Sequence, residues 1–233
     1  MLSRLLNLIF PSQCPVCNSV SDSHRHNPLC HSCWASIERY KGPGCSICGL
    51  PTPSPHTGIC AECLRSGPPF SKIHYYGIYE GSLKESVHLL KFGGIKRLSK
   101  PLSDLLLDLP FSPCDGIVPV PLHSTKLKER EFNQTALLGL HLSKALKTPL
   151  LLNSLQKIRL TKLQTEVSGK DRHSNLRKAY AVTGNITGKR LLLVDDVITT
   201  GATVRECALT LKRAGASNVE VIALARSMPR VNY

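Results

Sequence analysis

The 233-residue sequence has few aromatic and few acidic side chains, and it contains no long hydrophobic run. With one Trp and five Phe, the aromatic platforms on which single-stranded nucleic acids stack are not evident. Its apolar runs fall well short of the ~20 residues that cross a bilayer, so we expect no transmembrane segment. The 16 Asp and Glu face 30 Lys and Arg, and the net charge of +14 favours polyanionic partners, either nucleic acid or phosphorylated small molecules. A soluble basic protein without such a partner is the alternative.

The first ten residues are apolar, but they lack the small-residue cleavage site of a secretory signal peptide. Leu2, Leu5, Leu6 and Ile9 recur at helical spacing, which predicts a short amphipathic helix that packs on the protein or on a partner. A helix lying on a membrane surface is the alternative interpretation of the same pattern.

Eight of the ten cysteines form four Cys-x-x-Cys pairs, a pattern that favours metal chelation over disulfide bonding and hence a reducing, cytoplasmic setting. The pairs are Cys14 and Cys17, Cys30 and Cys33, Cys45 and Cys48, and Cys60 and Cys63. Sequential pairing predicts two structural zinc sites, because four thiolates leave no open coordination position. The spacing also allows crossed pairing, in which the first pair joins the third, and it allows iron–sulfur ligation.

A Ser-Gly-Pro-Pro linker at residues 66–69 predicts a boundary between a small domain over residues 1–67 and a larger one over residues 70–233. The first would hold the N-terminal helix and a double zinc ribbon, which needs metal because apolar residues are few. The second alternates strand and helix patterns, which implies an α/β fold with a mostly parallel sheet flanked by helices. The expected strands are 73–79, 116–121, 149–152, 191–194 and 219–225, and the expected helices are 83–92, 98–109, 132–146 and 202–214.

Residues 191–203 carry the strongest chemical signal. A buried apolar strand ends in Asp195 and Asp196, and hydroxyl-bearing or small residues follow up to the start of a helix. Paired carboxylates suit the hydroxyls of a polyol, and backbone N–H groups at a helix N-terminus suit a phosphate. The combination predicts a site for a ribose 5-phosphate group. An ordinary strand end with a helix cap would explain only one Asp and one Thr.

Two basic segments are expected near that site, because ligands of parallel sheets bind beyond the carboxyl ends of the strands. The first is a loop, residues 121–130, that follows the strand at 116–121. The second, residues 155–180, is predicted to be a long mobile loop with a short helix that could close over a ligand.

The run from Asp195 to Gly201 resembles the phosphoribosyl pyrophosphate signature of type I phosphoribosyltransferases, and within them the chain resembles the ComF family. Further segments resemble other signatures of that family, and the double zinc ribbon is also typical of it. These segments are residues 118–123 with 130–134, the set Thr161, Gln164, Arg172 and Asn175, and Gly81 with residues 91–93.

The resemblance implies that the chain binds phosphoribosyl pyrophosphate with magnesium and releases pyrophosphate through an oxocarbenium-like state, with catalysis mostly by positioning and charge stabilisation. Asp195 and Asp196 would bind the ribose hydroxyls, and Arg130 and Arg172 would act with them as catalytic residues. The implied ligand-binding residues are Thr199, Thr200, Gly201, Ala202 and Thr203 at the 5-phosphate, and Pro121, His123 and Lys126 at the pyrophosphate.

One position departs from the family pattern, which usually has Gly where this chain has Glu131. A carboxylate there would hinder a close anion contact, although the first turn of the next helix would also accommodate an acidic residue. The resemblance favours an enzyme linked to DNA uptake in competent bacteria. The alternatives are a non-catalytic protein that handles single-stranded DNA, or a sensor of phosphoribosyl pyrophosphate. The sequence predicts neither the acceptor substrate nor the oligomeric state.

Overall fold

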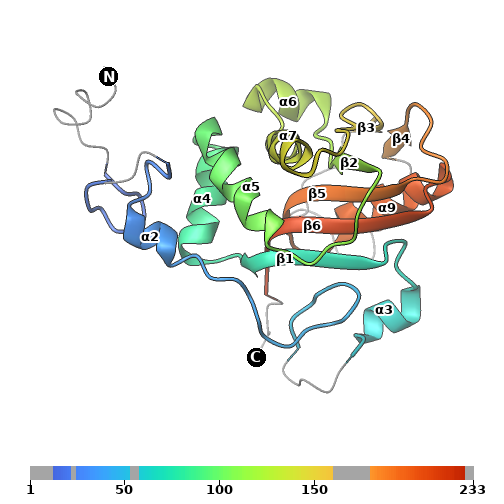
Figure 1. Ribbon diagram of the computed structural model, residues 1–233, viewed down its shortest axis with the longest axis horizontal. Coiled ribbons are helices and arrows are strands. Elements are labelled where there is room, and N and C mark those ends of the chain that lie inside the picture. The colour runs from blue at the N-terminus through green and yellow to red at the C-terminus, as the bar shows by residue number, and fades with distance from the viewer. Residues whose placement is uncertain (1–12, 22–24, 53–57, 160–178, 229–233) are drawn as a thin grey trace.

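The computed structural model describes residues 13–21, 25–52, 58–159 and 179–228. Its centre is a parallel sheet with the strand order β1-β6-β5-β2 (Figure 1). The strands are β1 (Lys72–Ile78), β2 (Gly116–Pro119), β5 (Arg190–Ile198) and β6 (Asn218–Arg226). A separate antiparallel pair joins β3 (Leu155–Lys157) to β4 (Tyr180–Val182).

Strands β5 and β6 are almost continuously buried, as expected for a parallel sheet that is covered on both faces. Leu191 and Leu193 pack with helix α9 (Ala202–Arg213), whereas Leu192 and Val194 pack with the opposite helical layer. That layer contains α4 (Gly81–Lys91), α5 (Ser99–Leu107) and α7 (Gln134–Leu146), with the short 3-10 helix η1 (Lys96–Leu98) between the first two (Figure 1).

Most of the expected elements are confirmed to within a few residues, but four segments differ. The segment 155–180, predicted to be a long loop, begins with β3 and ends in β4, which pair with each other. The basic segment after β2 was predicted to be a loop, and it contains helix α6 (Ser124–Arg130), which begins where the side chain of His123 accepts a hydrogen bond from Thr125 N. Strand β5 continues past the acidic pair because it stays paired with β6 as far as Ile198. Residues 149–152 contribute only an isolated bridge between Leu150 and Ile117, not a strand.

The cysteine-rich region adds two short helices, α2 (His31–Ala35) and α3 (Ala61–Ser66). It contacts the sheet domain directly: Ile73 N donates to Ile47 O at 2.8 Å, and Arg97 Nε donates to Asn27 O at 2.7 Å. The amphipathic helix expected within residues 1–10 lies outside the described residues. None of the helices in the described ranges has the length and hydrophobicity that a membrane crossing requires.

Candidate functional site

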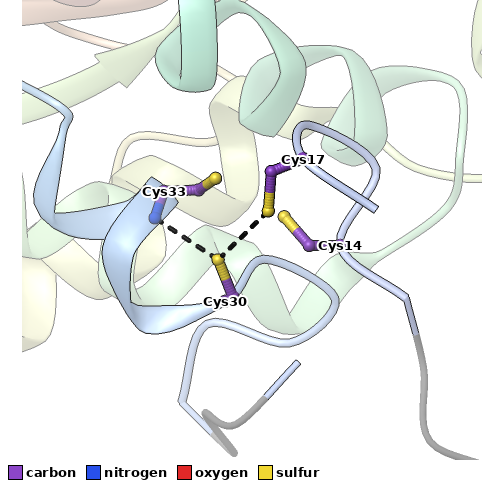
Figure 2. Close-up of side chains that lie close together, drawn as sticks. All are labelled: Cys14, Cys17, Cys30 and Cys33. Carbon is purple, nitrogen blue, oxygen red and sulfur yellow. Dashed lines mark hydrogen bonds between the residues drawn. The ribbon is translucent and has the colours of Figure 1, made fainter. Parts of the chain in front are cut away.

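The first two Cys-x-x-Cys pairs converge on one point (Figure 2). All sulfur atoms of Cys14, Cys17, Cys30 and Cys33 lie within 4.8 Å of one another, and Cys17 Sγ is 3.6 Å from Cys30 Sγ. Tetrahedral Zn–S bonds of about 2.3 Å require sulfur separations of about 3.8 Å. The tetrad therefore has the size and the donor set that one zinc ion requires.

The third and fourth pairs form a second tetrad of the same size. Cys45, Cys48, Cys60 and Cys63 have all their sulfur atoms within 4.8 Å, with Cys48 Sγ 3.7 Å from Cys60 Sγ. Sequential pairing of the cysteines is thus confirmed, and the crossed alternative is wrong. The other two cysteines, 114 and 207, belong to neither tetrad and pack with the hydrophobic core, as expected from the sequence.

Asp196 lies near the carboxyl end of β5, only 4 % exposed, and three groups hold its carboxylate. Lys91 Nζ from the end of α4 lies 2.6 Å from Oδ1, and Val197 N donates to the same oxygen at 2.6 Å. Gln134 Nε2 from the start of α7 donates to Oδ2 at 2.5 Å. Because a carboxylate offers about four acceptor positions, these contacts leave room for about one more donor.

Asp195 is also buried, at 9 % exposed, and its Oδ1 accepts a hydrogen bond from Asp196 N at 2.9 Å. Burial raises its pKa to about 7, the charge of Asp196 adds to this rise, and Lys91 opposes it. The two carboxyl groups therefore differ in their surroundings. The Asp196 carboxylate has the Lys91 ammonium at 2.6 Å, whereas the raised pKa of Asp195 makes that group change protonation near neutral pH.

The loop after β5 has the form expected of a phosphate cradle. Gly201 adopts a left-handed conformation with φ of 79° at the N-cap of α9 and has no side chain to cap the helix. The N–H of Ala202 donates to Thr200 Oγ1 at 3.4 Å. A cavity of about 30 Å³ lies between Asp195 and this loop. The loop residues that line it are Thr199, Gly201, Ala202 and Thr203. The structure thus brings Asp195 of the acidic pair to the loop, whereas the Asp196 carboxylate contacts Lys91 and Gln134.

Two of the expected pyrophosphate-side residues have roles in holding local structure. His123 Nδ1 accepts a hydrogen bond from Thr125 N at 3.3 Å and so caps α6. Arg130 ends that helix, stacks its guanidinium over the ring of Phe92 at 4.5 Å, and donates to Gln134 Oε1 at 3.5 Å. Arg130 is therefore linked to the acidic pair through one intervening side chain.

Of the remaining expected site residues, two lie in described segments and the others do not. Pro121 follows Val120, whose N–H donates to Val194 O of β5 at 2.9 Å, so the segment starts beside the acidic pair. Lys126 is half-buried in α6. Arg172 lies outside the described residues, as do Thr161, Gln164 and Asn175.

Glu131 does not begin a helix, so that expectation is wrong. It ends α6 in a left-handed conformation with φ of 62°, and α7 begins three residues later behind the cap of Asn133. Left-handed backbone at a helix C-terminus is the usual place for Gly. The glycine of the family pattern therefore matches a conformational demand that Glu131 meets under strain.

Sequence reasoning assigned no site role to Lys91 and Gln134, although both occur in segments that resemble family signatures. Their presence in those segments was the available signal. Neither can be paired with Asp196 from spacing, since the contact depends on how α4 and α7 pack on the sheet.

Comparisons with known proteins agree with this architecture. Residues 5–64 match a double zinc ribbon domain, and residues 138–230 match a phosphoribosyl transferase domain. Together with the parallel sheet and the two cysteine tetrads, these matches define a phosphoribosyltransferase-like α/β protein with an N-terminal double zinc ribbon.

Relatives that match this chain over most of their length show which family of phosphoribosyltransferase-like proteins it belongs to. The chain is 32 % identical to the DNA utilization protein YhgH of Salmonella typhi over 95 % of this chain and 100 % of the relative. It is 34 % identical to competence protein F of Haemophilus influenzae over 86 % and 91 %, and 27 % identical to competence protein ComFC of Streptococcus pneumoniae over 85 % and 87 %. The chain belongs to the ComF family.

Proposed function

We propose that the chain binds phosphoribosyl pyrophosphate with magnesium and transfers its phosphoribosyl group with release of pyrophosphate. The observation that carries this proposal is the placement of Asp195 beside Thr199, Gly201, Ala202 and Thr203 at the N-terminus of α9. A carboxyl group beside a helix N-terminus suits one ligand that carries both hydroxyls and a phosphate.

The free acceptor position of Asp196 and the ionised form of Asp195 would take the ribose hydroxyls, while residues 199–203 would hold the 5-phosphate. Lys91 and Gln134 would keep Asp196 oriented, since each donates to a different carboxylate oxygen. Magnesium prefers hard oxygen ligands and substrate phosphates, and it would neutralise the pyrophosphate charge without a dedicated protein cage. Arg130 and Lys126 would add positive charge on the pyrophosphate side, and the same role is proposed for Arg172.

Transfer is tested by pyrophosphate release from phosphoribosyl pyrophosphate and magnesium in the presence of purine bases, pyrimidine bases or amines as acceptors. The wild type should exceed the Asp195→Ala/Asp196→Ala double variant with at least one acceptor, and the exposed control Asp108→Ala should match the wild type. Equal release by the wild type and the double variant with every acceptor would contradict catalysis. Ligand binding without release would indicate a sensor.

A second candidate function is the handling of single-stranded DNA. One groove of about 1020 Å³ is lined by two basic side chains, Arg39 and Lys41, and by two aromatic ones, Tyr40 and Tyr76. Single strands bind where their bases can stack on aromatic side chains beside basic groups. Two acidic side chains also line the groove, Glu38 and Glu80. The competence and DNA utilization names of the relatives, together with the net charge of +14, support this candidate.

The affinity for a single-stranded oligonucleotide, measured across a range of salt concentrations, tests this function. Each phosphate contact contributes about −0.7 to the slope of log affinity against log salt. The Arg39→Ala/Lys41→Ala variant should therefore lose about 1.4 of the slope, whereas Lys144→Ala, an exposed residue outside the groove, should keep it. A slope near zero in the wild type would exclude phosphate-driven binding.

A further inference from the structure

A cavity of about 650 Å³ lies between the second cysteine tetrad and the sheet domain. Cys48, Cys60 and Cys63 line one side of it. Another part is lined by Thr199, Thr200 and Gly201, which belong to the loop after β5 (the phosphate-side loop). Arg226 lines the cavity from the end of β6. The cavity thus places Arg226, an arginine of the sheet domain, beside the metal-binding tetrad.

Arg226 is unusual among the described residues because two of the three nitrogens of its buried guanidinium have no hydrogen-bond partner. It is only 3 % exposed, and neither its Nε nor its Nη1 has a hydrogen-bond partner in the described part of the chain. A buried guanidinium is costly unless an opposite charge lies nearby. The structure must therefore supply negative charge close to this position.

Only two kinds of anionic group line the cavity within the described residues, Glu62 and the cysteines of the second tetrad. Glu62 is not a good candidate, since it is exposed and forms an ion pair with Arg65 of the same helix. Burial lowers the pKa of the Arg226 guanidinium, and the groups that oppose this shift are Cys48, Tyr75 and the cysteines at 60 and 45.

A zinc ion bound by four thiolates carries a net charge of −2, because four negative charges exceed the two positive charges of the metal. We propose that Arg226 is a positioning residue for the second zinc centre, where its buried positive charge offsets part of the negative charge of the tetrathiolate. The cation comes from the sheet domain, not from the ribbon, so the second centre is completed only when the ribbon packs on β1, the strand next to β6.

The position of Arg226 in the sheet links this centre to the candidate ligand site. Arg226 is the register partner of Ile198 in the β5–β6 ladder, and Ser227 N donates to Ile198 O at 2.9 Å. Thr199, the first residue of the phosphate-side loop, follows Ile198 directly. The proposed charge pairing therefore occurs next to the point where that loop leaves the sheet.

Cadmium-113 NMR of the protein with both tetrads loaded with cadmium tests the proposal, because each tetrad contributes one resonance whose shift reports the charge around its sulfurs. Arg226→Met should move the resonance that correlates with the Cys45 tetrad and leave the other in place. It should also speed the transfer of zinc from that tetrad to a chelator by about tenfold, the lower end of the usual effect of an outer-shell partner. Arg226→Lys, which keeps the charge, should restore most of both properties.

Arg205→Met is the matched control. Arg205 lines the same cavity, but it is partly exposed and donates to Ser66 Oγ, so its removal should leave the second resonance unmoved. Arg226→Gln replaces the methionine variant if the latter does not fold. Unchanged shifts and zinc transfer in the neutral variants would overturn the proposal, and so would an equal effect of Arg226→Lys, since shape and not charge would then matter.

Discussion

Lys91 Nζ lies 2.6 Å from Asp196 Oδ1, with the two side chains only 16 % and 5 % exposed. The pair joins the last residue of α4 to the acidic segment of β5, so it connects two segments that are far apart in the sequence. Two adjacent carboxylates in a buried strand repel each other, and Lys91 supplies the cation that makes their burial tolerable.

Replacing Lys91 by Met should lower the free energy of unfolding by about 3 kcal/mol, because a buried carboxylate loses its cation. Urea unfolding measures this change. Lys84→Met provides the control, since Lys84 is exposed on the same helix and should change stability by less than about 0.5 kcal/mol. A loss no larger than that of Lys84→Met would show that the pair does not stabilise the acidic segment.

Asp195 should make stability depend on pH in a specific direction. Its pKa in the folded chain is raised to about 7 from 3.8, so between these values the folded state keeps a proton that the unfolded state releases. The free energy of unfolding contributed by this group therefore falls as pH rises through that window, and it levels off above it.

The Asp195→Asn variant lacks this titration, so it should gain stability relative to the wild type between about pH 5 and about pH 8. Urea unfolding of both proteins at these two pH values gives the comparison. A difference between wild type and variant that stays constant with pH would contradict the raised pKa.

The strained position of Glu131 predicts a stabilising substitution. Glu131→Gly should raise the free energy of unfolding by about 1 kcal/mol, because Gly adopts the left-handed conformation without a Cβ clash. Glu129→Gly, two residues earlier in the interior of α6, should lower it by about 1 kcal/mol. Thermal or urea unfolding measures both variants, and effects of the same sign would refute this account of the residue.

Zinc content tests the assignment of the cysteines. Two tetrads predict two zinc ions per chain after dialysis, and Cys17→Ser should retain only one. Cys114→Ser should retain both, because Cys114 belongs to neither tetrad. Elemental analysis of the purified proteins decides the matter, and a single zinc ion in the wild type would contradict the assignment.

The features that could be predicted from the sequence are those that short segments encode. The spacing of the cysteines predicted the metal ligands, although it left their pairing open, and the run from Asp195 to Thr203 predicted the loop, since each depends on neighbours in the chain. Lys91 and Arg226 could not be placed in this way. Their partners become neighbours only when α4 packs on the sheet and when the ribbon packs on β1, next to β6.

The local backbone structure between β2 and α7 could not be predicted from the sequence either. The segment after β2 was read as a loop because prolines and basic residues dominate it, but seven residues without Pro or Gly follow His123 and form α6. The φ angle of Glu131 is not visible in a sequence, so the alternative that this residue belongs to the first turn of the next helix stayed open until the structure excluded it. The boundary between residues 67 and 70, and the role of Arg172, stay predictions.

Calorimetric titration with phosphoribosyl pyrophosphate and magnesium tests the central claim most directly. The wild type should bind with one site per chain, and the Asp195→Ala/Asp196→Ala variant should lose measurable binding while its ribbon keeps both zinc ions. Equal binding by the two proteins, or no binding by the wild type, would contradict the assignment of the acidic pair and its loop as a phosphoribosyl site.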